Sequence, residues 1–161
     1  MIEVKNLTKR YGDHTAVDHL SFQVEEGQIY GFLGPNGAGK STTMNMITGY
    51  IASTEGTVVI NGHDILEEPE EAKKDIGYLP EQPEFPTAMT GLQYLRFQTA
   101  VRERKSIEKG IRTAQRLGLN LEEKIAKLSP MDKKKLGIAG ALVHDPRVVL
   151  LDEPTRDLDQ A

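Results

Sequence analysis

The chain has 161 residues, 38% hydrophobic and 27% charged, which is the size and balance of one globular domain with a core of its own. Its 24 acidic and 20 basic residues give a formal net charge of −4, which argues against a general nucleic-acid-binding protein. The absence of cysteine excludes disulfides, thiolate metal sites and cysteine catalysis. Since the chain starts without a basic-then-apolar leader and its apolar runs are short, we expect neither a signal segment nor a membrane-spanning helix.

The first fifty residues predict strands, then a glycine-rich loop and a helix. Residues 2–8 and 15–24 alternate apolar and polar side chains, as half-buried strands do. Residues 28–33 form a nearly continuous apolar run, which is typical of a fully buried strand. After the loop, apolar residues recur at the spacing of a helix over 40–51.

The remainder of the chain is predicted to mix strands and helices. Strands are expected at 57–61, 75–79 and 147–151, and a short acidic helix or loop at 66–74. Thr90 is a suitable N-cap for the first of the later helices. These helices are expected over 91–105, 106–117 and 130–144.

A glycine-rich segment after the third predicted strand matches G-x-x-x-x-G-K-[ST]. Glycines let the backbone turn its N–H groups toward an anion, and the N-terminal end of the following helix adds positive potential. Lys40 supplies a mobile charge for the β- and γ-phosphates, and the Ser41 hydroxyl can ligate Mg²⁺. We therefore predict a nucleotide phosphate site made by Gly34, Pro35, Asn36, Gly37, Ala38, Gly39, Lys40, Ser41 and Thr42.

A second phosphate-site pattern lies more than a hundred residues later. Residues 148–153 are four apolar residues followed by Asp152 and Glu153. A strand that ends at Asp152 would bring its carboxylate toward Mg²⁺, and Glu153 beside it could polarise the attacking water. No Asp is followed three residues later by Gly, and there is no Asn-Lys-x-Asp, so guanine specificity is not expected.

These residues together resemble the ATP-binding domain of ABC transporters, along the whole chain and in order. The details look most like bacterial exporters that have a separate ATPase chain. Tyr11 matches the aromatic residue that stacks on adenine in that family, and Val17 matches the apolar residue near the ribose. Glu81 stands where the loop that senses the γ-phosphate usually carries Gln, and a carboxylate there can still approach Mg²⁺.

The resemblance implies an α/β fold, a P-loop NTPase core with an N-terminal antiparallel β-subdomain and a small helical subdomain, truncated after the Walker B strand. Residues 1–33 would form the β-subdomain leading into the phosphate loop, and 34–80 the core around that loop. Residues 81–144 would hold the helical subdomain and the signature, and 145–161 the Walker B strand with the start of the D-loop.

The largest departure from the family is its signature Leu-Ser-Gly-Gly-Gln, which reads Leu128-Ser129-Pro130-Met131-Asp132 here. In the family this segment crosses a dimer interface, and its Ser and glycine amides cap the γ-phosphate of the other subunit, so the resemblance makes Ser129 a nucleotide contact. Pro130 has no N–H and Met131 adds bulk. Asp132 brings negative charge close to a phosphate, so all three changes weaken anion binding.

Other segments bear on how complete the site is. The lysines at 133–135 either offset the charge of Asp132 or form a solvated helix face, and we favour the solvated face. Residues 156–159 replace a small residue before Leu-Asp by bulkier charged ones. The family continues to a switch histidine that no histidine here matches, and His144 is interpreted as a helix-end residue. We therefore expect an incomplete domain in which ATP binding survives better than hydrolysis.

The resemblance implies an ATPase with ATP and Mg²⁺ at its site, in which Lys40 and Glu153 are catalytic and Ser41, Asp152 and Glu81 hold the metal. Its partners would be transmembrane permease subunits and a second ATP-binding domain in a homodimer or heterodimer, with no nucleic acid. It would lie in the cytoplasm, peripheral on the inner face of the membrane.

The alternative is a degenerate module with little hydrolysis that acts as a regulatory or structural partner in an asymmetric dimer. A member of the superfamily that acts on DNA or ribosomes is disfavoured by the charge.

Overall fold

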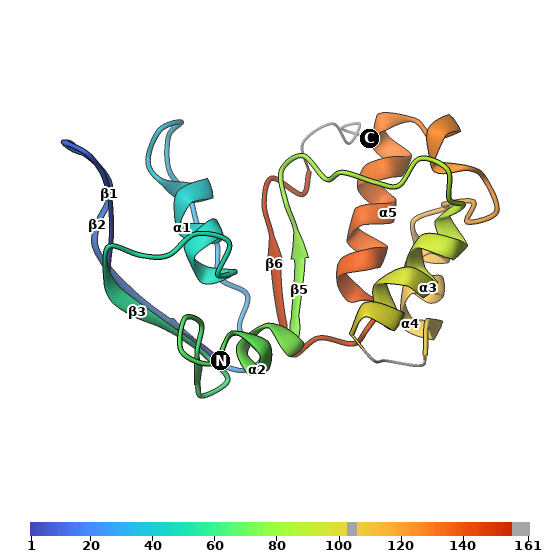
Figure 1. Ribbon diagram of the computed structural model, residues 1–161. Coiled ribbons are helices and arrows are strands. Elements are labelled where there is room, and N and C mark those ends of the chain that lie inside the picture. Colours follow the sequence, from blue (N-terminus) through green and yellow to red (C-terminus); the bar gives the residue numbers. More distant parts are fainter. Residues whose placement is uncertain (103–105, 156–161) are drawn as a thin grey trace. The chain divides into compact units, whose positions relative to one another are not determined.

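The computed structural model describes residues 1–102 and 106–155, and these divide into two compact units. The first unit runs from Met1 to Lys74 and the second begins at Asp75. The chain is α/β, with an antiparallel sheet in the first unit and a parallel strand pair in the second. Figure 1 labels the elements of both units.

The first unit is built on a four-stranded antiparallel sheet of order β2-β1-β3-β4. Alternation of buried and exposed residues in β1 puts Ile2 and Val4 on the packed face, as a half-buried strand requires. The sheet carries the helices α1 and α2 of the same unit. The elements are β1 (Ile2–Tyr11), β2 (His14–Val24), α1 (Lys40–Ile47), β3 (Glu55–Ile60), β4 (His63–Asp64) and α2 (Pro69–Lys74).

The second unit pairs β5 (Ile76–Leu79) with β6 (Val148–Leu151) in parallel, with Ile76 opposite Val148 and Leu79 opposite Leu151. Between these strands the chain forms α3 (Gly91–Val101), α4 (Glu108–Arg116), the 3₁₀ turn η1 (Ile125–Lys127) and α5 (Pro130–Leu142). Helix α5 lies against β5 and packs on α3 and α4 (Figure 1).

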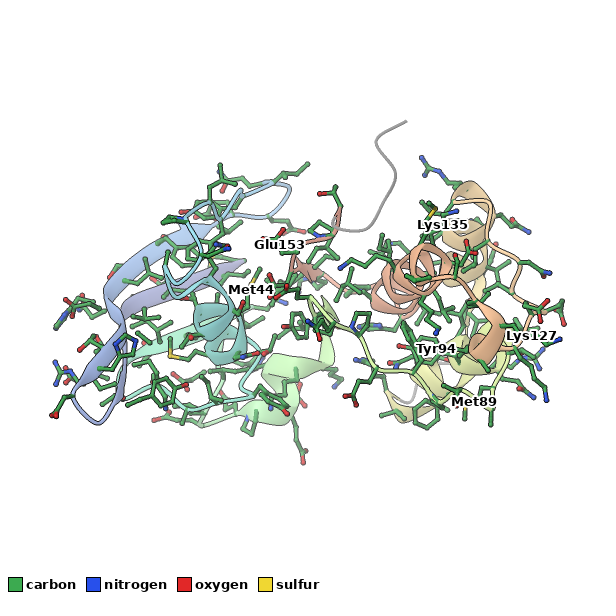
Figure 2. All side chains as sticks on the ribbon, turned by 90° about the horizontal axis from the view of Figure 1, so that it is seen from above. Met44, Met89, Tyr94, Lys127, Lys135 and Glu153 are labelled. Carbon is green, nitrogen blue, oxygen red and sulfur yellow. The ribbon has the colours of Figure 1, made fainter. Side chains whose placement is uncertain are left out.

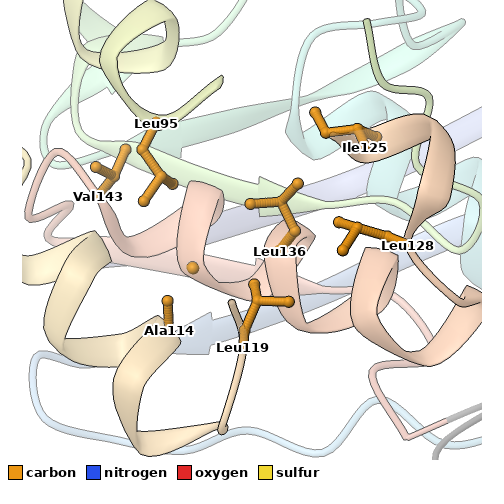
Figure 3. Packing of buried hydrophobic residues seen from close by; sticks show 8 residues of the cluster. Leu95, Ala114, Leu119, Ile125, Leu128, Leu136 and Val143 are labelled. Atoms are coloured by element: carbon orange, nitrogen blue, oxygen red, sulfur yellow. The ribbon is translucent and has the colours of Figure 1, made fainter. Parts of the chain in front are cut away.

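The core of the second unit joins its helices. Leu95 of α3, Ala114 of α4 and Leu136 of α5 are fully buried in one cluster, shown in Figure 3. The rest of the cluster is Leu119, Ile125, Leu128, Ala139 and Val143. Since each of these side chains is excluded from water, the cluster fixes where α5 begins and therefore where Ser129 is held.

Most predicted elements are confirmed: β1, β2 and β3 are longer than predicted, and the helices are shorter. The helix expected over 40–51 ends at Ile47 because Gly49 adopts a φ of +64° and donates its N–H to the carbonyl of Met46. Thr90 is the N-cap of α3, in a reciprocal capping box with Gln93. The segment 66–74, predicted as a short acidic helix or loop, contains α2.

The prediction of a buried strand over 28–33 is wrong. Within the described residues this segment pairs with no strand, and Ile29 and Leu33 are 101% and 93% exposed. Tyr30 stacks on Phe22 of β2, with ring centroids 5.1 Å apart. An apolar run becomes a strand only when a neighbouring strand takes up its hydrogen bonds, and no described strand pairs with this segment.

Candidate functional site

The glycine-rich loop is held against β2 by Gly39, the residue that caps α1. Gly39 has a φ of +79°, and a Cβ there would lie 2.3 Å from the carbonyl oxygen of Ala16 and 3.0 Å from Cγ2 of Val17. Only glycine combines that backbone conformation with so close an approach. The predicted loop and the predicted ribose neighbour Val17, which is buried, are therefore in direct contact.

The N-terminus of α1 is open to an anion. The first N–H groups of a helix have no partner inside it, and no side chain caps α1. The first turn also carries no acidic residue, so the positive end of the helix is not neutralised. Lys40 Nζ donates to the carbonyl oxygens of Gly34 and Pro35 at 2.7 and 2.9 Å, which places the ammonium beside the loop.

Tyr11, the predicted adenine contact, is the last residue of β1 and pairs with His14 across a tight turn. Its side chain remains available, since the residue is 52% exposed. The ammonium of Lys9 lies 5.1 Å from the centroid of its ring. The first unit thus contains the loop, Val17 and Tyr11.

In the second unit, the carboxyl ends of β5 and β6 bring two predicted acidic residues to one edge. Asp152 follows β6, is 8% exposed and donates its N–H to the carbonyl of Leu79 at 2.9 Å. Glu81 comes two residues after β5. Burial, followed by the negative charge of Asp152, raises the pKa of the Tyr78 phenol above its usual value. A buried carboxylate at this edge fits a cation ligand.

Glu153, the predicted base, is exposed two residues after the end of β6 (Figure 2). Its φ of +46° lies in the left-handed region, which few residues other than glycine adopt. Strained backbone of this kind is concentrated at functional sites, where surrounding structure holds it in place.

Ser129, the predicted signature contact, is the N-cap of α5. Its Oγ accepts a hydrogen bond from the N–H of Asp132 at 3.1 Å and donates one to Oδ2 of the same residue at 2.8 Å. Pro130 occupies the first helical position, where its missing N–H costs nothing. The Asp132 carboxylate therefore lies at the end of α5 where a helix attracts anions.

The interpretation of the lysines at 133–135 as a solvated face is wrong for Lys134. This residue is 4% exposed and its Nζ donates to the carbonyl oxygen of Glu81 at 3.1 Å. Lys135, labelled in Figure 2, forms an ion pair with Asp132 at 3.4 Å, so it partly offsets that charge. Small buried residues at 137 and 141 share the helical face of Lys134, and this spacing could have revealed its burial.

Within residues 1–102 and 106–155, no group of three or more His, Asp or Glu side chains is arranged to hold a metal. Mg²⁺ needs no such cluster, because it binds through one or two protein oxygens, phosphates and water. His144 is buried after α5, with its Nε2 3.2 Å from the carbonyl oxygen of Ile76, in line with a helix-end role. The prediction for residues 156–159 lies outside the described part of the chain.

Two residues near the predicted site were not anticipated as parts of it. Lys9 contacts the Tyr11 ring, and their spacing of two along a strand, which puts both on one face, was the available signal. Tyr78 lies in β5 close enough to Asp152 for the carboxylate to raise its pKa. Nothing in a strand-like run such as 75–79 identifies the tyrosine in advance.

Comparison with known proteins gives the same assignment over nearly the whole chain. The profile of the family described as ABC transporter matches residues 17–156. The uncharacterised ABC transporter ATP-binding protein YhcH of Bacillus subtilis is 40% identical over 100% of this chain and 53% of its own length. The bacitracin transport ATP-binding protein BcrA of Bacillus licheniformis is 38% identical over 99% of this chain and 53% of its own. The chain thus spans about half the length of these relatives.

Solved structures of ATP-binding subunits have the same fold. The ATP-binding subunit of an ABC transporter has a TM-score of 0.88 at 29% identity, over 99% of this chain and 69% of its own. A dimeric ATP-binding cassette in a post-hydrolysis state, bound to ADP and Pi, has a TM-score of 0.88 at 26% identity, over 99% of this chain and 77% of its own. Among the described residues, no helix is long and apolar enough to cross a membrane.

Proposed function

Because the chain belongs to the ABC transporter family, we propose that it binds Mg·ATP and hydrolyses it to drive transport through partner membrane subunits. The observation that carries this proposal is the glycine-rich loop in front of the N-terminus of α1, which no side chain caps. Its backbone N–H groups and the Lys40 ammonium can together neutralise a chain of phosphates. The contact of Gly39 with β2 supports this role, because it fixes the loop on a rigid sheet.

Each unit supplies different groups to the proposed reaction. The first provides phosphate donors, the Ser41 hydroxyl for Mg²⁺ and the exposed Tyr11 ring for adenine. The second provides the Asp152 carboxylate for Mg²⁺, with Glu81 at the same edge, and Glu153 to orient water for in-line attack on the γ-phosphate. Burial of Asp152 supports its role, because a carboxylate excluded from water gains most from a cation.

The proposed partners rest on the family and on two of the similar proteins. A relative named for bacitracin transport and a dimeric cassette bound to ADP and Pi support a second ATP-binding domain and transmembrane permease subunits as partners. We propose that ATP joins two such domains, that hydrolysis separates them, and that this cycle moves the permease. The chain would then lie peripherally on the inner face of the membrane.

Lys40→Ala tests the phosphate loop directly. Removing the ammonium should weaken Mg·ATP binding at least about tenfold, measured by calorimetry, because one charge-assisted contact to phosphate is lost. Lys5→Met is the matched control, since Lys5 forms an exposed ion pair with Glu3. Unchanged affinity in Lys40→Ala would contradict the proposal that this loop binds the phosphates of ATP.

A second candidate function is a degenerate ATP-binding partner with little turnover. The specific observation in its favour is that Ser129 and Asp132 form two hydrogen bonds with each other at the N-terminus of α5. With its hydroxyl engaged and a carboxylate beside it, this end of the helix repels an incoming phosphate.

Steady-state turnover separates the two candidates. Brisk ATP hydrolysis by this chain alone, dependent on its dimerisation, would exclude the degenerate partner. Binding with little turnover would favour it, and a variant carrying Pro130→Gly, Met131→Gly and Asp132→Gln should then hydrolyse faster.

A further inference from the structure

Lys9 makes two contacts that join the proposed adenine platform to the rest of the first unit. Its Nζ donates to the carbonyl oxygen of Ala52 at 2.7 Å, and the same ammonium lies 5.1 Å from the centroid of the Tyr11 ring. Ala52 belongs to the segment between α1 and β3. One side chain therefore bridges the end of β1 and the chain that follows the helix of the phosphate loop.

The strand geometry explains why these groups meet. Lys9 and Tyr11 are two residues apart in β1, so their side chains leave the same face of the sheet. The irregularity at this point of the β1–β2 pair lies on β2, where Lys9 is opposite Val17 and Arg10 is opposite Thr15. Alternation along β1 is therefore intact from Lys9 to Tyr11, and the ammonium is directed to the ring.

The charge of Lys9 is available for this contact. In the part of the chain that the structure describes, no carboxylate lies within ion-pair distance of Lys9, while its neighbours Lys5 and Arg10 pair with Glu3 and Glu55. A cation within about 6 Å of an aromatic centroid is attracted to the ring face. The hydrogen bond to the carbonyl of Ala52 holds the ammonium in one place, so it does not move with the ring.

We propose that Lys9 is a positioning residue for the base of the nucleotide, an inference that rests on the proposed function. The anchored ammonium covers one face of the Tyr11 ring and holds an otherwise half-exposed side chain in one orientation. The opposite face is then presented to adenine without the entropy cost of ordering the ring on binding. Lys9 itself contacts neither base nor phosphate.

Calorimetric titration of the full chain with Mg·ATP and with Mg·tripolyphosphate, which lacks the base, tests this role. Lys9→Met should raise the Kd for ATP about two- to fivefold and leave the Kd for tripolyphosphate unchanged. Lys9→Arg keeps the cation and should restore ATP affinity. Thermal unfolding of each variant shows whether the fold is retained.

Two comparisons decide the outcome. Lys5→Met, on the same strand, should change neither Kd, and in a Tyr11→Ala background Lys9→Met should have no further effect. If Lys9→Met weakens both ligands equally, Lys9 contacts phosphate and the proposal is overturned. It is also overturned if Tyr11→Ala weakens ATP while Lys9→Met does not. Failure of Lys40→Ala to weaken tripolyphosphate is a different result, which would contradict the proposed function instead.

Discussion

The ammonium of Lys134 lies 3.1 Å from the carbonyl oxygen of Glu81, so a buried lysine joins the first turns of α5 to the loop after β5. This helix begins at the altered signature and this loop carries a predicted Mg²⁺ ligand. A movement of either segment must therefore break this hydrogen bond or move the other segment with it. The hydrogen bond lies wholly within the second unit.

Substitution of Lys134 separates the contribution of its aliphatic stem from that of its charge. Lys134→Ala should lower the free energy of unfolding by about 2 kcal/mol, because it empties a packed site. Lys134→Met keeps the stem and removes a costly buried charge along with its hydrogen bond, so it should stay within about 1 kcal/mol of the parent. Urea denaturation measures both, and equal losses would show that the ammonium, not the stem, stabilises α5.

The sequence alone predicts local structure well where neighbouring residues determine it. The loop before α1, the cap at Thr90 and the strand just before Asp152 each need only their own residues and immediate neighbours. The exposed segment at 28–33 is different, because an apolar run is compatible with a strand only if a pairing partner is present.

Contacts between residues far apart in the chain also cannot be predicted from the sequence pattern. Burial of Lys134 depends on a carbonyl fifty-three residues away, and the position of the Lys9 ammonium depends on one forty-three residues away. Charged residues are rarely buried, so a solvated lysine is the ordinary expectation. It is wrong for Lys134 because the fold places a carbonyl acceptor beside its ammonium.

Gly39→Ala should abolish the phosphate-binding conformation of the loop. The new Cβ would meet the carbonyl oxygen of Ala16 at 2.3 Å, and the φ of +79° is unfavourable for alanine. We expect Mg·ATP affinity to fall at least about tenfold, which corresponds to roughly 1.4 kcal/mol. Gly31→Ala is the control, because no atom lies within 4 Å of its added Cβ. Equal affinities in the two variants would show that the packing of Gly39 is irrelevant to binding.

Ser129→Ala tests the cap of α5. Loss of the acceptor for the Asp132 N–H should lower the free energy of unfolding by about 1 kcal/mol. Ser129→Thr retains a hydroxyl and should lie close to the parent protein. Chemical denaturation of both variants provides the measurement, and an Ala variant as stable as the Thr variant would contradict the observed cap.

The ion pair between Lys109 of α4 and Asp145 predicts a pH dependence of stability. The hydrogen bond from Lys109, followed by its charge, holds the pKa of the exposed Asp145 carboxyl below its ordinary value, and Arg112 and His144 lower it further. A depressed folded-state pKa means that the unfolded chain binds more protons between the two pKa values. The contribution of the pair is therefore complete above the unfolded pKa of about 4, and is lost as the pH falls through the lower folded value.

Lys109→Met should consequently reduce the acid sensitivity of the second unit. We expect the drop in Tm between about pH 6 and about pH 3 to be smaller in this variant than in the parent, and added salt to diminish the difference because the pair is exposed. Lys127→Met, which removes the exposed pair with Glu123, is the matched control and should leave the drop as it is in the parent. An identical acid response in Lys109→Met would mean that Asp145 titrates independently of Lys109, and that other carboxylates determine acid unfolding.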